Sequence, residues 1–206
     1  MATSSPSCPD LFPLSVYESV RPDYRRIGIF CALGWFVGMT IMQLVTTHDS
    51  LILILSLNAV GAVFFGAVFA LVMRRWMRRV MRELYDGTSP WMSPVPPGEY
   101  EARVMCSVMR GRIAVGGHLY VGRELWTFMP HTKNLRGHRD PMRWERPGRL
   151  VLSTEPIQSR WLTVILGSKT SDRLVVSLGG LRDQFVVPDA KLAVFELQKI
   201  LSVSAQ

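Results

Sequence analysis

Residues 27–73 read IGIFCALGWFVGMTIMQLVTTHDSLILILSLNAVGAVFFGAVFALVM, two apolar runs joined by a short polar turn. The runs, residues 27–47 and 51–73, contain no Asp, Glu, Lys, Arg or Pro. At about 1.5 Å per residue, each run is long enough as a helix to cross a hydrocarbon core of about 30 Å. Because backbone amides in lipid need partners within the same segment, the stretch predicts a hairpin of two transmembrane helices.

Arginines bracket this hairpin on its outer sides. Three of them precede the first run, five follow the second, and the connector of residues 46–50 has neither Lys nor Arg. By the positive-inside rule, this asymmetry predicts a two-span protein of the cell membrane with both termini in the cytoplasm. Residues 1–20 are polar and are expected to form a disordered tail.

Small residues predict where helices meet. Gly34 and Gly38 form a GxxxG step in the first run, and the second run carries a matching row of Ala62, Gly66 and Ala70. Such rows permit close helix packing, so they mark either the seam of the hairpin or, through Gly34 and Gly38, a contact between copies of the chain.

Two strongly polar side chains, Gln43 and Asn58, lie within the apolar runs. A transport protein would use them to contact a substrate. Function inside a membrane usually recruits ionisable groups, and these runs have none, so we expect the two side chains to hydrogen-bond each other.

The second run continues into a basic segment, residues 74–85. Its arginines recur at spacings that place them on one face of a continuing helix, with Trp76 among them. This is typical of a juxtamembrane helix that contacts an anionic leaflet. The predicted membrane-interface residues are Arg74, Arg75, Trp76, Arg78, Arg79 and Arg82.

Composition divides the remaining chain. Residues 86–98 are rich in Pro, Gly and Ser and predict a semi-rigid linker. Residues 99–206 provide enough chain for one cytoplasmic domain. The formal net charge is +8, which would suit nucleic acid as well as lipid. Basic charge next to a membrane span more often reflects topology and lipid contact, so we expect no nucleic-acid partner.

The domain of residues 99–206 shows the pattern of short β-strands followed by one helix. Asp189 stands at an N-cap position before an apolar stripe at helical spacing. Overall we predict an α+β membrane protein, in which the C-terminal amphipathic helix caps a small antiparallel barrel or sandwich. The apolar bursts that predict strands are residues 102–109, 113–115, 119–128, 150–152, 161–166, 174–178 and 185–187.

The stretch CSVMRGRIAVGGHLYV, residues 106–121, followed by LWTFMPH, residues 125–131, resembles the first half of a GRAM domain. In that pleckstrin-homology-like family, a buried strand leads through a glycine and a Leu-Tyr pair to an apolar strand that ends in Phe-x-Pro. QFVVP, residues 184–188, is similar to the closing strand. The resemblance covers residues 99–202, and it departs from the family at Gly122-Arg123-Glu124, where a Thr and a basic residue are common.

This resemblance implies a lipid-binding or protein-binding module without catalysis or cofactor. The residues agree, because the four histidines stand apart from cysteines and paired carboxylates, and no P-loop, GxSxG or HExxH motif is present. Cys8, Cys31 and Cys106 are too scattered for a metal site or a disulfide framework. We therefore expect neither an enzyme nor a metalloprotein.

Two basic groups compete as the anion-binding site. One is the pair Arg110 and Arg112 beside Gly111, where related folds often hold phosphoinositide headgroups. The other group lies along a long irregular segment, residues 131–149, in which Trp144 is placed to enter the membrane interface. It comprises Lys133, Arg136, Arg139 and Arg143, with Arg146 further along; an ordinary solvated loop balanced by Asp140 and Glu145 is the alternative.

Two function classes follow. The first is a membrane adaptor whose cytoplasmic domain reads anionic lipid headgroups or a protein partner at the bilayer surface. The second is a small accessory subunit of a larger membrane complex, in which the hairpin selects the partner.

Overall fold

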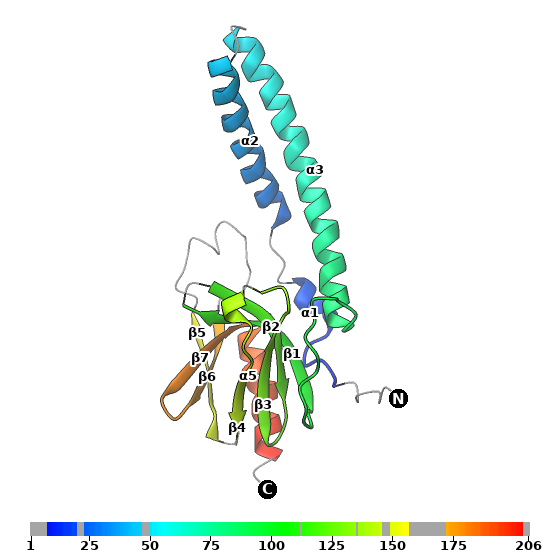
Figure 1. Cartoon of the computed structure of the whole chain (residues 1–206), viewed down its shortest axis with the longest axis vertical. Coiled ribbons are helices and arrows are strands. Elements are labelled where there is room, and N and C mark those ends of the chain that lie inside the picture. The colour runs from blue at the N-terminus through cyan, green and yellow to red at the C-terminus, as the bar shows by residue number, and fades with distance from the viewer. Residues whose placement is uncertain are drawn as a thin grey trace. The chain divides into compact units, whose positions relative to one another are not determined.

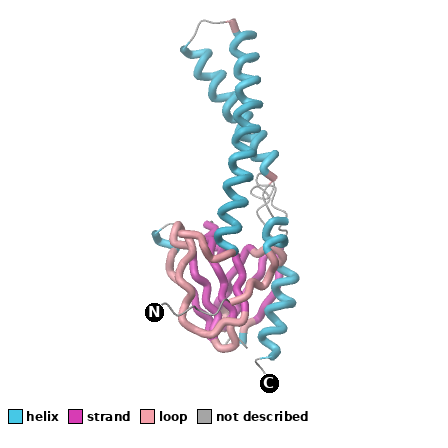
Figure 2. The backbone as a smooth tube through the Cα atoms, turned by 90° about the vertical axis from the view of Figure 1, so that its right-hand side faces the viewer, coloured by secondary structure: helices cyan, strands magenta, loops and turns pink. Residues whose placement is uncertain are grey.

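The computed structural model describes residues 8–19, 23–46, 50–111, 113–134, 136–145, 149–156 and 172–203. They belong to two compact units (Figures 1 and 2). One is a helical hairpin within Arg21–Met81, and the other is a sheet unit that combines the N-terminal segment with the chain from Arg82 onward.

The hairpin unit consists of helix α2, Tyr24–Thr46, and the hairpin part of helix α3, Leu51–Tyr85. Asp23 caps α2, because its Oδ1 accepts the amide of Arg25 at 3.0 Å. Ser50 precedes α3, and its Oγ accepts the amide of Leu53 at 3.4 Å. Both helices are long and apolar enough to cross a membrane. Figure 1 shows them running antiparallel, as the short connector predicts.

The seam of the hairpin lies at glycines, although not at the pair predicted for the first helix. A Cβ added to Gly28 would come within 2.8 Å of the Gly66 carbonyl oxygen, and one added to Gly66 within 2.7 Å of the Gly28 carbonyl oxygen. At Gly34 and Gly38 an added Cβ would have nothing within 4 Å. The prediction of a seam is therefore confirmed for the small row of α3 and wrong for Gly34 and Gly38.

The predicted contact between Asn58 and Gln43 is confirmed. The Asn58 amide donates to Gln43 Oε1 at 2.9 Å and to Thr40 Oγ1 at 3.2 Å. Trp35 of α2 stacks on Phe65 of α3, with ring centroids 4.7 Å apart. The hairpin thus keeps the amides of Asn58 and Gln43 between the helices.

The sheet unit contains seven antiparallel strands in the order β4-β3-β2-β1-β7-β6-β5. The sheet is open, with β4 and β5 at its edges, so of the predicted barrel or sandwich the described residues do not form a closed barrel. The strands are β1 Ala102–Arg110, β2 Ile113–Val121, β3 Leu125–Pro130, β4 Met142–Glu145, β5 Val151–Pro156, β6 Asp172–Leu178 and β7 Leu181–Val186.

The sheet bends so that its two parts share one core. Trp144 on the edge strand β4 meets Phe185 on β7, with ring centroids 5.8 Å apart, although three strands separate β4 from β7 in the sheet order. Phe128 on β3 lies 5.7 Å from the same Phe185 ring. Helix α5, Ala190–Val203, packs on β5 and β6 through buried Ala193 and Leu197.

The prediction of a C-terminal helix beginning after Asp189 is confirmed. Asp189 Oδ1 accepts the amide of Leu192 at 3.0 Å, the bond expected of an N-cap. The β6–β7 turn contains Gly179 and Gly180, both with positive φ, as a two-residue hairpin turn requires. The predicted strand 119–128 is instead divided at Gly122, and β4 has no counterpart among the predicted strands. The predicted strand at 161–166 lies outside the described residues.

Two segments that were expected to lie outside the folded domain belong to the sheet unit. Of the predicted disordered tail, residues 14–19 form helix α1, Leu14–Ser19, and both Phe12 and Tyr17 are buried, because their rings pack in the sheet unit. The predicted linker lies against the sheet. There the amide of Thr132 donates to the Trp91 carbonyl at 2.9 Å, and Ser93 donates to the Pro130 carbonyl.

Candidate functional site

The predicted membrane-interface residues all lie on one continuous helix. α3 runs without interruption from Leu51 to Tyr85 and carries the five arginines on its exposed surface. Trp76 is 45% exposed. The last of the five, Arg82, lies in the sheet unit, where its Nε is 3.9 Å from Glu18 Oε1 of α1. The final turn of α3 is therefore part of the sheet unit.

The two predicted anion-binding groups meet in the structure. Arg110 ends β1, and its guanidinium donates to the Asp140 carbonyl at 2.7 Å, which ties the end of β1 to the segment before β4. Arg139 in the same segment donates to the Asn134 carbonyl at 2.7 Å. Each guanidinium has five N–H donors, so these bonds hold the segment and leave other donors for an anion.

The remaining members of the two groups have different surroundings. Lys133 is exposed in the turn after β3, and Arg143 is exposed on β4. Arg136 begins the 3₁₀ turn η1, Arg136–His138, of which the structure describes the backbone at this residue but not its side chain. Arg112 also lies outside the described residues. The cationic surface, as we use the term below, is therefore Arg110, Lys133, Arg139 and Arg143.

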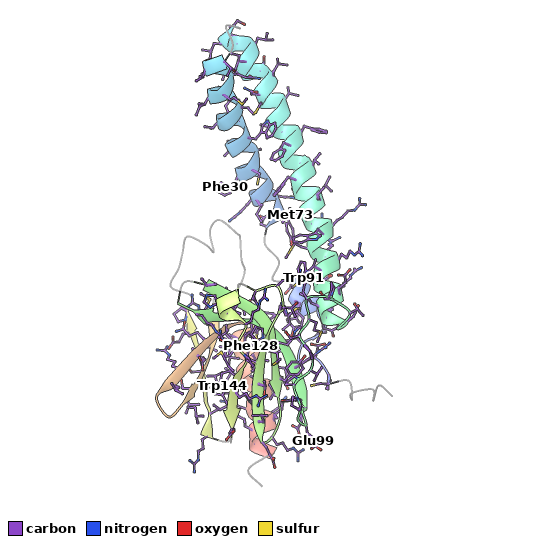
Figure 3. The ribbon with its side chains drawn as sticks, viewed as in Figure 1. Phe30, Met73, Trp91, Glu99, Phe128 and Trp144 are labelled. Atoms are coloured by element: carbon purple, nitrogen blue, oxygen red, sulfur yellow. The ribbon has the colours of Figure 1, made fainter. Side chains whose placement is uncertain are left out.

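Trp144 does not face solvent, contrary to the prediction that it enters a membrane interface. It is 5% exposed, and its Nε1 donates to Asp183 Oδ2 at 3.2 Å. Burial raises the pKa of Asp183, and the hydrogen bond from Trp144 opposes this change. The physical reason for the correction is strand alternation, since Arg143 and Glu145 face outward on β4 and Trp144 must face the core. Figure 3 labels Trp144 and Phe128, whose rings both meet that of Phe185.

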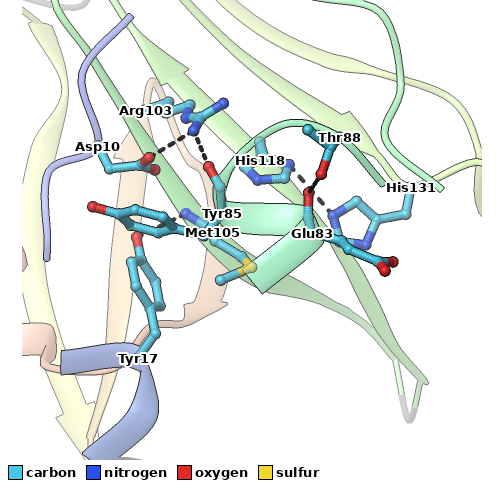
Figure 4. A network of polar contacts seen from close by, with 9 residues as sticks. All are labelled: Asp10, Tyr17, Glu83, Tyr85, Thr88, Arg103, Met105, His118 and His131. Carbon is cyan, nitrogen blue, oxygen red and sulfur yellow. Dashed lines mark hydrogen bonds and ion pairs between the residues drawn. The ribbon is translucent and has the colours of Figure 1, made fainter. Parts of the chain in front are cut away.

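A buried ion pair that the sequence did not predict joins three parts of the sheet unit (Figure 4). Arg103 of β1 donates to Asp10 Oδ2 at 2.7 Å and also to the carbonyl of Tyr85, the last residue of α3. Burial raises the pKa of Asp10, opposed by the hydrogen bond from Arg103. The pair thus holds the N-terminal segment and the carboxyl end of α3 against β1. The carboxyl end of a helix carries partial negative charge, so the Arg103 cation is favourable there.

Tyr17 of α1 makes the neighbouring contact with β1. The amide of Met105 donates to its hydroxyl oxygen at 3.0 Å, and its ring meets that of Tyr85 at 6.0 Å. Burial raises the pKa of this hydroxyl. These bonds explain why the N-terminal segment is ordered where composition predicted a free tail.

Two histidines also come together. His131 Nε2 lies 3.3 Å from Nδ1 of the fully buried His118, whose Nε2 has no hydrogen-bond partner among the described residues (Figure 4). Burial, reinforced by the neighbouring His131, lowers the pKa of His118 to about 3, and burial lowers that of His131 to about 4. Both imidazoles are therefore neutral near pH 7.

Within the described ranges, no group of three or more His, Cys, Asp or Glu side chains could hold a metal ion. Sequence spacing could not have identified the Arg103–Asp10 pair, because its members are 93 positions apart. His118 and His131, which looked isolated in the sequence, are paired across β2 and the end of β3.

Comparison with known proteins gives no family. No family model matches the chain, and no curated protein does. A solved structure that matches in part is the C-terminal domain of an unknown protein from Leishmania infantum. It is 10% identical, with 63% of this chain and 97% of that chain covered, at a TM-score of 0.37. No conclusion about fold or function follows from a likeness at this level.

Proposed function

We propose that the chain is an integral membrane adaptor, without enzymatic activity, whose sheet unit binds anionic lipid headgroups or a protein partner at the bilayer surface. The observation that carries the proposal is the outward face of the hairpin. It is built of large apolar side chains, among them Ile52 and Val45, each 81% exposed. Full burial of such a side chain is worth about 1.5–3 kcal/mol, and a contiguous apolar surface of this extent marks contact with lipid or protein.

The polar groups of the hairpin support the same assignment. The Asn58 amide donates to Gln43 and Thr40. The hydroxyls of Thr46 and Ser56 donate to backbone carbonyls within their own helices. A hydrocarbon environment requires such internal satisfaction. The arginines at the outer ends of α2 and α3 favour an orientation with both termini in the cytoplasm.

The sheet unit supports a binding role at the surface. Its seven antiparallel strands followed by one helix have the element order that the strand and helix patterns of the sequence predict. The cationic surface gathers four side chains from β1, β4 and the segment between β3 and β4. Guanidinium groups match phosphate oxygens in a bidentate manner, so anionic headgroups are the proposed ligand of this surface.

Two measurements on the full chain test this proposal. Resistance of the protein to extraction by alkaline carbonate tests membrane integration, and labelling of Cys8 and of a His48→Cys variant with an impermeant maleimide tests orientation. Integration requires that carbonate leaves the protein in the membrane, and the proposed orientation requires labelling of the two cysteines from opposite sides. Release into the supernatant would refute the integral assignment.

Headgroup binding is tested separately in nanodiscs with and without anionic lipid. We expect anionic lipid to slow hydrogen exchange around residues 131–143, and we expect the triple change Lys133→Gln, Arg139→Gln, Arg143→Gln, which leaves Arg110 to hold the segment, to reduce this difference strongly. A matched triple, Lys191→Gln, Lys199→Gln, Arg182→Gln, changes the same charge outside the cationic surface. Equal loss in both variants would show that only net charge matters.

A second candidate function follows from the first helix. Gly34 and Gly38 lie away from α3, with nothing within 4 Å of an added Cβ, and leave a face on which another helix could pack closely. This favours an accessory subunit, or a homo-oligomer, joined through that face. Cross-linking at Val37→Cys, compared with Phe64→Cys on the other helix, tests it: the candidate requires cross-links at Val37→Cys alone.

A further inference from the structure

An apolar groove of about 500 Å³ runs between the two helices on one face of the hairpin unit. Its lining is almost entirely apolar. Small residues form the hollow and larger ones border it, namely Gly28, Ala32 and Gly66 with Leu33, Phe36 and Val63. The groove exists because the close approach at Gly28 and Gly66 leaves no side chains to fill the space beside the seam.

A polar hollow of about 390 Å³ continues the groove at its basic end and shares Arg25 and Ala70 with it. Arg25 and Arg74 supply its positive charge. Among the described residues, no carboxylate lies within ion-pair distance of either guanidinium.

Asp23 also borders this hollow, but its carboxylate already has partners. Oδ1 accepts the amides of Arg25 and Arg26, and Oδ2 lies 3.5 Å from Arg26 Nε. The charge at the mouth that lacks a partner is therefore positive, and its two guanidinium groups come from different helices.

The length of the groove fits one leaflet of a bilayer. From Arg25 to Phe36 the helix rises about 17 Å, roughly half of a hydrocarbon core of about 30 Å. An acyl chain of that leaflet therefore matches the groove in length, and a phosphate at its head would lie at the depth of the flanking arginines. Tyr24 at the mouth is a residue type enriched at this depth.

We propose that this groove, together with Arg25 and Arg74, binds one anionic glycerophospholipid. The phosphate lies between the two guanidinium groups, and one acyl chain lies along the seam. Two arginine forks match a phosphate better than a single carboxylate, which favours a phospholipid over a free fatty acid. The proposal rests on the membrane integration proposed above, and it concerns the hairpin rather than the cationic surface of the sheet unit.

Native mass spectrometry of the full chain in a mild detergent tests this site, with phosphatidylglycerol and phosphatidylcholine as probes. We expect one phosphatidylglycerol per chain to bind in preference to phosphatidylcholine. The double variant Arg25→Gln, Arg74→Gln should weaken phosphatidylglycerol binding by about tenfold or more, because charge-assisted bonds are lost. The matched control Arg123→Gln, Arg182→Gln removes the same charge from exposed positions of the sheet unit and should change binding by less than about twofold.

Filling the groove provides an independent arm. Ala67→Phe places a ring in the groove and should weaken binding of the same lipid, whereas Val60→Phe, outside the lining, should not. Equal effects of both arginine pairs, equal binding of the two lipids, or undiminished binding to Ala67→Phe would each overturn the site. Equal binding of oleate in place of phosphatidylglycerol would overturn the phosphate assignment. Carbonate extraction separates the proposals, because a chain that stays in the membrane but binds no lipid refutes only the groove.

Discussion

Replacing Arg103 with methionine removes one half of a buried ion pair while keeping the length of the side chain. Asp10 and Arg103 are 7% and 15% exposed in their side chains, and their charged atoms are 2.7 Å apart. At an effective dielectric constant of about 20 the attraction at this distance is about 6 kcal/mol, and the desolvation of both groups offsets most of it. The variant loses the attraction, but the desolvation of Asp10 remains.

We expect Arg103→Met to lower the free energy of opening the sheet unit by about 3 kcal/mol, the low end for breaking a buried pair, because Arg103 is partly solvated. The thiol of Cys106 in β1 is buried and reports such opening. In the full chain with Cys8→Ser and Cys31→Ser, labelling of Cys106 in detergent should become about 150-fold faster, at 1.4 kcal/mol per factor of ten.

Adding Asp10→Asn to this variant should slow labelling by about tenfold, since the unpaired buried charge is then absent. The penalty of Arg103→Met should also shrink at lower pH. Without Arg103 the pKa of folded Asp10 rises further above its unfolded value, so the folded state of the variant binds the proton more tightly and gains stability as pH falls. Acceleration below threefold, or no rescue by Asp10→Asn, would refute the reasoning.

Two further predictions concern His118 and Gly66. The pKa of His118 is about 3 when folded, against about 6.5 when unfolded, so the unfolded state binds more protons below pH 6.5 and acidification from pH 7 to pH 5 should cost about 2 kcal/mol of stability. Thermal melts should show a smaller acid loss for His118→Gln than for the unchanged chain; an equal acid loss in both would contradict the neutral buried imidazole. Gly66→Leu should separate the hairpin helices, because a Cβ there meets backbone at 2.7 Å, and shift the fluorescence of Trp35, whereas Gly34→Leu should not. A fluorescence shift of equal size in both glycine variants would place the seam elsewhere.

The sequence predicted the hairpin and its internal amide pair because both follow from local chemistry. It did not identify Gly28, because Gly28 and the pair Gly34 and Gly38 lie on different faces of the first helix, and local sequence does not show which face meets the second helix. The connector decides between them by setting which residues oppose each other. Gly28 faces Gly66 and Ala70, which are small, whereas Gly34 has nothing within 4 Å of an added Cβ, and it is the next residue, Trp35, that stacks on Phe65 of α3.

The short strand β4 illustrates a signal that was present in the sequence but obscured by charge. Met142, Arg143, Trp144 and Glu145 alternate, and only the tryptophan is fully buried. Arginines on both sides made the segment resemble a solvated loop. The Arg103–Asp10 pair offered no such signal, because each residue looks like an ordinary surface charge until the fold brings them together.

The connection between the two units changes how the lipid proposal must be tested. The proline-rich segment of residues 86–98 was expected to be the tether, yet it lies against the sheet, and the chain passes between the units within helix α3 at Met81 and Arg82. Among the described residues, no separate linker segment therefore connects the two units. If the proposed membrane integration holds, this surface acts at high effective concentration at the bilayer, so the proposed headgroup contacts can be weak. Solution affinity of an isolated fragment would underestimate them. A fragment that begins at residue 99 would also lack Asp10 and leave Arg103 without its partner. Lipid binding by the cationic surface must therefore be measured on the full chain.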